Sequence, residues 1–168
     1  PFGFIVIDKP EGLTSHACVN RLRTVFGIKR VGHGGTLDPA VTGVLPIALG
    51  NATRLLPYLP GEKTYQGTIQ LGKRTSSDDL QGDLIDTQNW PSLSNQCLES
   101  VLEKFRGEIE QCPPQISSVH FKGERAYKRA RRGEVMELKS KRINIHELKL
   151  LNWDPNVGQL EVNIKCSS

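Results

Sequence analysis

The chain has 168 residues, of which 37% are hydrophobic and 24% are charged, and its net charge is +4 at pH 7. This composition excludes a disordered tail and a fibrous protein. A membrane-spanning chain is also excluded, because a span needs about 18 consecutive apolar residues and no stretch approaches that length. Residues 119–142 hold nine basic and three acidic side chains. Such a segment is typical either of a surface that binds a polyanion or of a solvated basic loop.

The first sixty residues are predicted to combine helices and strands. The predicted elements are a short buried strand at 4–7, a helix at 15–26, a strand or short helix at 44–49, and a short helix at 51–58. Pro10 follows the first strand and cannot continue a ladder. Thr14 or Ser15 can cap the helix, and Gly27 ends it. Between the second and third elements lies a loop rich in glycine.

The remaining residues are predicted to be mainly antiparallel strands. The predicted elements are strands at 63–71, 143–151 and 160–166, a helix at 94–106 and a short helix within 124–133. Residues 63–71 alternate in polarity, which indicates a half-buried strand with Tyr65 on its apolar face. The whole pattern predicts an α+β fold with a mixed, mainly antiparallel sheet flanked by helices and loops. The four cysteines, at 18, 97, 112 and 166, are too far apart for a zinc site and are predicted to be buried or free thiols.

Asp38 is the strongest candidate for chemistry. It lies in the glycine-rich loop, where a carboxylate can face a substrate without steric cover. From residue types alone, an ordinary Asp-Pro turn is the simpler interpretation. The loop matches no nucleotide-binding fingerprint, and serine hydrolase chemistry is excluded because there is no Gly-x-Ser-x-Gly elbow.

Five blocks of the sequence resemble the TruB family of tRNA pseudouridine synthases. They occur in the family's order, cover nearly the whole chain, and read DKPEGLTS from residue 8, GHGGTLDPAVTGVLP from 32, KTYQGTIQLG from 63, TSSDDLQG from 75 and QCPPQISSVHFKGERAYKRARRG from 111. A match of this extent makes Asp38 the expected catalytic residue.

The resemblance implies an isomerase that converts uridine to pseudouridine in the T-loop of tRNA, at position 55. Asp38 would be the nucleophile that attacks C1′ of the sugar, or the base that takes a proton from C2′. Tyr65 would stack on the flipped uracil and assist removal of the C5 proton, although a core aromatic is the simpler interpretation without the family. Arg131 would pair with Asp38, with Arg129 and Arg132 as local competitors. The family needs neither a metal nor a cofactor.

The resemblance also implies residues that contact RNA or support the site. His33 would lie near the flipped nucleotide. The expected phosphate contacts are Lys29, Arg30, Lys122, Arg125, Lys128 and Arg132. Lys9 would support the active-site loop from below. Asp79 would be structural or adjacent to RNA, and Asp78 beside it leaves the register of that block open.

The family comparison predicts the organisation of the protein. Residues 1–168 would be one catalytic domain, incomplete at its C-terminus and without the small C-terminal RNA-binding PUA domain. The active site would lie in a basic cleft between the Asp38 loop and residues 111–133. The expected partner is the T-arm of tRNA, with no membrane association, a cytoplasmic location and a monomeric full-length enzyme.

Two other function classes stay open at this point. A non-catalytic RNA-binding or RNA-folding protein could keep the same surface, but it has no need of Asp38. A nucleoside hydrolase would need a second carboxylate to position water, and no pair in the sequence has convincing spacing.

Overall fold

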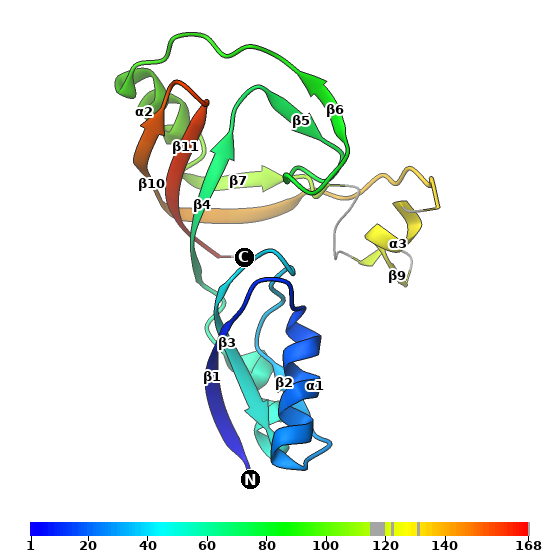
Figure 1. The fold of residues 1–168 in the computed structure, drawn as a ribbon. Helices are drawn as coiled ribbons and strands as arrows, with labels where there is room; N and C mark the ends of the chain where they lie inside the picture. The colour runs from blue at the N-terminus through cyan, green and yellow to red at the C-terminus, as the bar shows by residue number, and fades with distance from the viewer. Residues whose placement is uncertain (115–119, 122, 131, 168) are drawn as a thin grey trace. The chain divides into compact units, whose positions relative to one another are not determined.

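The structure is a computed structural model that describes residues 1–114, 120, 121, 123–130 and 132–167. The chain divides into two compact units, Pro1–Pro60 and Gly61–Ser168. Figure 1 shows a small sheet with one long helix in the first unit and a larger sheet in the second. All strand pairs among the described residues are antiparallel, as expected for the predicted α+β class.

Unit 1 is a three-stranded sheet in the order β1-β3-β2. Its elements are β1 (Gly3–Lys9), α1 (Ser15–Phe26), β2 (Val31–His33), β3 (Gly43–Leu49) and the 3-10 helix η1 (Gly50–Tyr58). Leu45, Ile47 and Leu49 of β3 are buried and form a core with Cys18 and Val19 of α1. This unit therefore holds β3 between two neighbours and covers one sheet face with α1.

The predicted helix at 15–26 is confirmed, and its ends follow the predicted signals. The Thr14 hydroxyl accepts a hydrogen bond from the backbone N–H of Ala17 at 3.0 Å, so Thr14 is the N-cap. Gly27 adopts a left-handed conformation with φ of 63° and caps the C-terminus. Not all of its apolar side chains are buried, since Val25 lies in the last turn and is 72% exposed.

The expectation of a buried strand at 4–7 is wrong. β1 alternates between inward and outward residues, with Phe4 40% and Val6 65% exposed. Only the inward face of β1 meets the core, because α1 packs against that one face of the sheet. β2 was not predicted, because three residues within a glycine-rich loop carry no periodic signal; its strand character comes from pairing with β3.

Unit 2 is organised around a four-stranded sheet in the order β4-β11-β10-β7. Its elements are β4 (Lys63–Gln70), β5 (Lys73–Thr75), β6 (Leu84–Thr87), α2 (Asn95–Glu103), β7 (Gly107–Gln111), β8 (His120–Phe121), β9 (Glu124–Arg125), α3 (Ala126–Ala130), β10 (Lys141–Asp154) and β11 (Gln159–Cys166). The strands predicted at 63–71, 143–151 and 160–166 are confirmed as β4, β10 and β11. The helix predicted at 94–106 is shorter, and β7 was not predicted.

The core of unit 2 lies between α2 and one face of this sheet. Leu98 and Leu102 of α2 are buried together with Ile145 and Leu148 of β10 and Val162 of β11. β10 keeps apolar side chains on the face that meets α2 along its 14 residues. Its pairing with β11 shifts twice, between Ile145 and Glu147 and between Leu150 and Asn152. Each shift places one extra residue in β10 and returns the apolar side chains to the core.

Of the four predicted thiols, Cys18 and Cys166 are buried, and Cys97 and Cys112 are exposed. Over the described residues, no helix has the length and apolar character needed to cross a membrane.

Trp90, in the loop between β6 and α2, contacts two other loops of unit 2: the one between β4 and β5 and the one between β10 and β11. Its indole nitrogen donates a hydrogen bond to the carbonyl of Pro155 at 3.1 Å. The ring also lies against Gly72 and Gly158, where a Cβ atom would approach ring carbons to 2.9 and 2.8 Å. Gly158 has φ of +68°, so both its conformation and its contact with the ring favour glycine.

We predict that Gly158→Ala destabilises the protein more than Gly107→Ala. Both glycines have positive φ, but a Cβ at Gly107 would meet no atom within 4 Å. Strain alone should cost about 1–2 kcal/mol at either position, and the clash with Trp90 should add roughly 1–3 kcal/mol at Gly158. Urea unfolding of the two variants measures the difference, and equal losses of stability would contradict this role of Trp90.

Candidate functional site

The Asp38 loop connects β2 to β3 at the end of the sheet where Lys9 pairs with Gly43. The residue Asp38 is exposed. Its backbone carbonyl accepts a hydrogen bond from the N–H of Val41 at 3.0 Å, which closes a tight turn. The carboxylate thus stands on a turn that the backbone itself stabilises.

Lys9 holds the residue that follows Asp38. It is fully buried, and its Nζ donates hydrogen bonds to the carbonyl oxygens of Pro10 at 2.9 Å, Leu13 at 2.6 Å and Pro39 at 3.2 Å. The N–H of Gly12 also donates to the Pro39 carbonyl, at 2.8 Å. A buried ammonium is costly unless its donors are satisfied, and three carbonyls supply the acceptors that it needs.

Ser15 holds the residue that precedes Asp38. Its hydroxyl accepts a hydrogen bond from the N–H of Leu37 at 2.9 Å and donates one to the carbonyl of Leu37 at 3.2 Å. In the described part of the chain, Lys9 and Ser15 are the two buried polar residues. Each forms hydrogen bonds with an immediate neighbour of Asp38, so both buried polar side chains help to orient this one loop.

The other unit 1 residues predicted to bind RNA lie at different ends of the sheet. His33 is half-buried in β2, pairs with Ile47, and precedes the Asp38 loop. Lys29 and Arg30 are exposed and follow the C-terminus of α1, whereas Ser15 begins that helix. Twelve helical residues span about 18 Å, so the structure does not bring these two cations to Asp38.

Tyr65 lies on β4, opposite Ile164 of β11. It is half-buried and packs against the unit 2 core. The ring therefore rests on a firm apolar support, at a strand that forms the edge of the sheet.

Asp79 stabilises the turn between β5 and β6. Its Oδ1 accepts hydrogen bonds from the Ser77 hydroxyl at 2.6 Å, the Gln81 N–H at 2.9 Å and the Gly82 N–H at 3.1 Å. These donors, the Ser77 hydroxyl first, hold the pKa of Asp79 below its usual value. The Asp79 backbone carbonyl also accepts a hydrogen bond from the Thr75 hydroxyl, so both the side chain and the backbone of Asp79 stabilise the turn.

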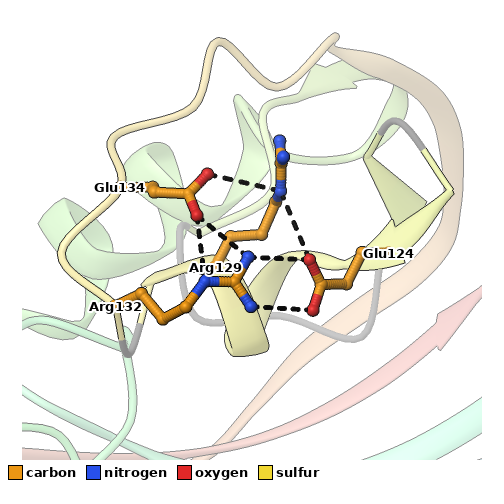
Figure 2. Close-up of polar contacts among 4 residues, drawn as sticks. All are labelled: Glu124, Arg129, Arg132 and Glu134. Atoms are coloured by element: carbon orange, nitrogen blue, oxygen red, sulfur yellow. Dashed lines mark hydrogen bonds and ion pairs between the residues drawn. The ribbon is translucent and has the colours of Figure 1, made fainter.

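Four charged side chains form a closed network around α3 (Figure 2). Arg132 donates to both carboxylate oxygens of Glu124, at 2.9 and 2.7 Å, and to Oε1 of Glu134, at 3.0 and 2.9 Å. Arg129 lies 3.5 Å from Glu124 and 3.3 Å from Glu134. Hydrogen bonding and charge from Arg132 lower the pKa of Glu124 to about 2. Two of the cations in the basic segment are therefore paired within the segment itself.

The remaining predicted residues of this segment divide into two groups. Lys128 of α3 is exposed. Arg131 and Lys122 lie outside the described residues, as does the side chain of Arg125. The predicted pairing of Arg131 with Asp38 stays a prediction.

Two groups of functional interest escaped the sequence analysis. Thr14 and Ser15 are both of residue types that cap helices, but one helix needs only one N-cap. The second hydroxyl was therefore the signal that Ser15 has another role. Glu124 and Glu134 are acids within a strongly basic segment, a pattern that indicates local ion pairs. Among the described residues, no group of three or more His, Cys, Asp or Glu side chains is arranged to hold a metal ion.

Comparison with known sequences supports the resemblance. Residues 23–168 match the profile described as "TruB family pseudouridylate synthase (N terminal domain)". The chain is 68% identical over its whole length to the tRNA pseudouridine synthase B of Prochlorococcus marinus strain MIT 9313, of which it covers 52%. It is 65% identical, again over its whole length, to the enzyme of the same name from Synechococcus sp. strain CC9311, of which it covers 57%. The chain thus spans about half the length of the curated relatives it matches.

Solved structures share the fold. The structure titled "Crystal Structure of a Cbf5-Nop10-Gar1 Complex" aligns with a TM-score of 0.69 and 26% identity, over 98% of this chain and 39% of that chain. A second, titled "Structure of H/ACA RNP bound to a substrate RNA containing 2'-deoxyuridine", aligns with a TM-score of 0.65 and 25% identity, over 98% and 38%. These matches confirm the predicted α+β pseudouridine-synthase fold. By sequence profile, by identity and by fold, the chain belongs to the TruB family of pseudouridylate synthases and corresponds to its N-terminal domain.

Proposed function

We propose that the protein converts uridine to pseudouridine in the T-loop of tRNA, at position 55, with Asp38 as its catalytic carboxylate. The observation that carries this proposal is the anchoring of the Asp38 loop: the carboxylate is exposed, while its two neighbours are fixed by buried Lys9 and Ser15. An exposed reactive group on a rigid support is what catalysis by orientation requires. The names of the curated relatives support the reaction and the RNA class.

The proposed reaction exchanges one bond of the nucleoside for another. The Asp38 carboxylate attacks C1′ of the target uridine, the C1′–N1 bond breaks, and uracil leaves with the electron pair of that bond. The base then rotates without leaving the site, C5 attacks C1′, and the carboxylate departs. Loss of the C5 proton and protonation of N1 complete the isomerisation, so no atom is gained or lost. In the alternative route, Asp38 first takes the C2′ proton and uracil leaves by elimination; Asp38 then returns the proton to C2′ as C5 bonds to C1′.

Tyr65 and Arg131 complete the proposed site. The Tyr65 ring replaces the stacking that the flipped uracil loses, and its hydroxyl assists removal of the C5 proton. Arg131 pairs with Asp38 and keeps the carboxylate ionised and oriented. His33, which precedes the Asp38 loop, contacts the flipped nucleotide.

Exposed cations supply the proposed affinity for the T-arm. Lys128 is exposed beside the paired arginines and is the described cation of this segment that we assign to phosphate. Lys29 and Arg30 lie about 18 Å from the start of α1, so any phosphate that they bind is remote from the target base.

We predict that Asp38→Asn abolishes pseudouridine formation and leaves tRNA binding unchanged. The side chain is exposed and the turn is closed by its backbone carbonyl, so Asn should keep the loop intact. Asn lacks the charge and the nucleophilicity that the reaction needs. Mapping of pseudouridine in a T-arm transcript, beside a binding assay, checks both halves. Product formed by the purified variant above the level without enzyme would remove Asp38 from this role.

We predict that Ser15→Ala lowers kcat by about 10- to 100-fold with little change in KM, because loosening Leu37 misplaces Asp38 without touching the RNA surface. Thr24→Ala on the same helix removes a hydroxyl that bonds the exposed carbonyl of Asn20 and is the matched control. A fall in kcat at Thr24→Ala equal to that at Ser15→Ala would show that general helix stability, not the Leu37 contact, is responsible.

We predict that Tyr65→Phe keeps binding and fold but slows the late proton transfer, whereas Tyr65→Ala also lowers stability by roughly 1–3 kcal/mol. The ring packs on the unit 2 core, so only the aromatic variant keeps that packing. Single-turnover kinetics and thermal unfolding separate the two effects. Identical behaviour of the two variants in both measurements would refute separate roles for the ring and the hydroxyl.

A further inference from the structure

Arg132 already holds anions in the positions where an arginine binds phosphate. Its Nε and both terminal nitrogens donate to the carboxylates of Glu124 and Glu134 (Figure 2). Paired oxygens of a carboxylate and of a phosphate fit the guanidinium fork in the same bidentate manner. A phosphate that binds Arg132 in this bidentate manner must therefore displace at least one carboxylate oxygen.

The network is exposed enough for this exchange. The exposed fraction is 51% for the Arg132 side chain, 34% for Glu124 and 40% for Glu134. Solvent-exposed ion pairs contribute little free energy and are screened by salt. The carboxylates therefore do not hold the arginine too tightly for a polyanion to compete.

We propose that Arg129 and Arg132 form a phosphodiester-binding site whose resting occupants are Glu124 and Glu134, and that RNA backbone phosphate replaces these carboxylates on binding. The inference rests on the proposed function, since RNA is the source of the phosphate. It assigns the two glutamates a regulatory role: they lower the affinity of this surface for any polyanion until a phosphate is positioned to take their place.

This exchange has a distinct dependence on salt. A free arginine that binds phosphate releases counterions from RNA, which makes affinity fall steeply with salt. An arginine whose carboxylate is displaced leaves a new free carboxylate that gathers cations, and this uptake offsets part of the release. Freeing Arg132 from Glu124 should therefore steepen the salt dependence as well as raise the affinity.

The test measures the Kd of the full-length protein for an unmodified T-arm stem-loop RNA over a series of KCl concentrations. We expect Glu124→Gln to bind about fivefold more tightly and to steepen the slope of log K against log salt by roughly one. Glu137→Gln makes the same charge change in the same basic segment, and in the described part of the chain no ion pair joins Glu137. This control should gain less than about twofold.

A mutant cycle tests whether the two arginines are responsible. In a background that carries both Arg129→Gln and Arg132→Gln, the gain from Glu124→Gln should fall to that of Glu137→Gln. Weaker or unchanged binding by Glu124→Gln would overturn the proposal and make the network a structural brace, and so would a gain that survives loss of both arginines. These binding measurements need no turnover, so failure of this proposal can be distinguished from failure of the proposed reaction.

A second measurement uses the unmodified protein, in case Glu124→Gln fails to fold. Inorganic phosphate is titrated while the side-chain NMR resonances of arginine are followed. We expect the Arg132 Nε–H resonance to shift in a saturable way, and chloride at the same ionic strength to produce no such shift. An Arg132 resonance that responds to phosphate and chloride alike would overturn the proposal.

Discussion

A lysine ammonium without access to water needs hydrogen-bond acceptors, and Lys9 finds three in the carbonyls of Pro10, Leu13 and Pro39. These acceptors come from the end of β1, the approach to α1 and the Asp38 loop. Leaving any of them unpaired would cost free energy, because a buried charge cannot be solvated elsewhere. One cation thus joins three segments of unit 1, and the position of Asp38 follows from satisfying it.

Unit 2 uses charge in the opposite way. The pairs of Arg132 with Glu124 and Glu134 are solvent-exposed and confined to one short stretch around α3. Water and salt weaken such exposed pairs, but they hardly weaken the hydrogen bonds of Lys9, which is buried. The protein therefore combines a permanent electrostatic anchor beneath the proposed catalytic loop with exchangeable pairs in its basic segment.

Local signals in the sequence predicted the elements that carry their own periodicity or caps. The helix α1 was predicted from Thr14 and Gly27, and β4 from its alternation. β2 and β7 could not be predicted in this way, because each is defined by hydrogen bonds to a distant partner. Asp38 stood out in its glycine-rich loop, but the residue types around it made a plain turn the simpler interpretation, and only the family resemblance favoured catalysis. Ser15 and Glu124 each had a weak signal in the sequence, a second capping hydroxyl and an acid in a basic segment, but neither pattern specifies the partner atoms.

The strand order of the second sheet bears on how the chain folds as it is synthesised. Unit 1 has all three of its strands by Leu49. In the described part of the chain, β4, by contrast, pairs with β11 alone, so Tyr65 has no strand partner until Ile164 has been made. At ordinary rates of translation this gap lasts roughly 5–20 seconds. Left unpaired for that time, β4 offers open backbone hydrogen-bonding groups and one apolar face to other nascent chains, which gives the cell a reason to shield it with a chaperone during elongation.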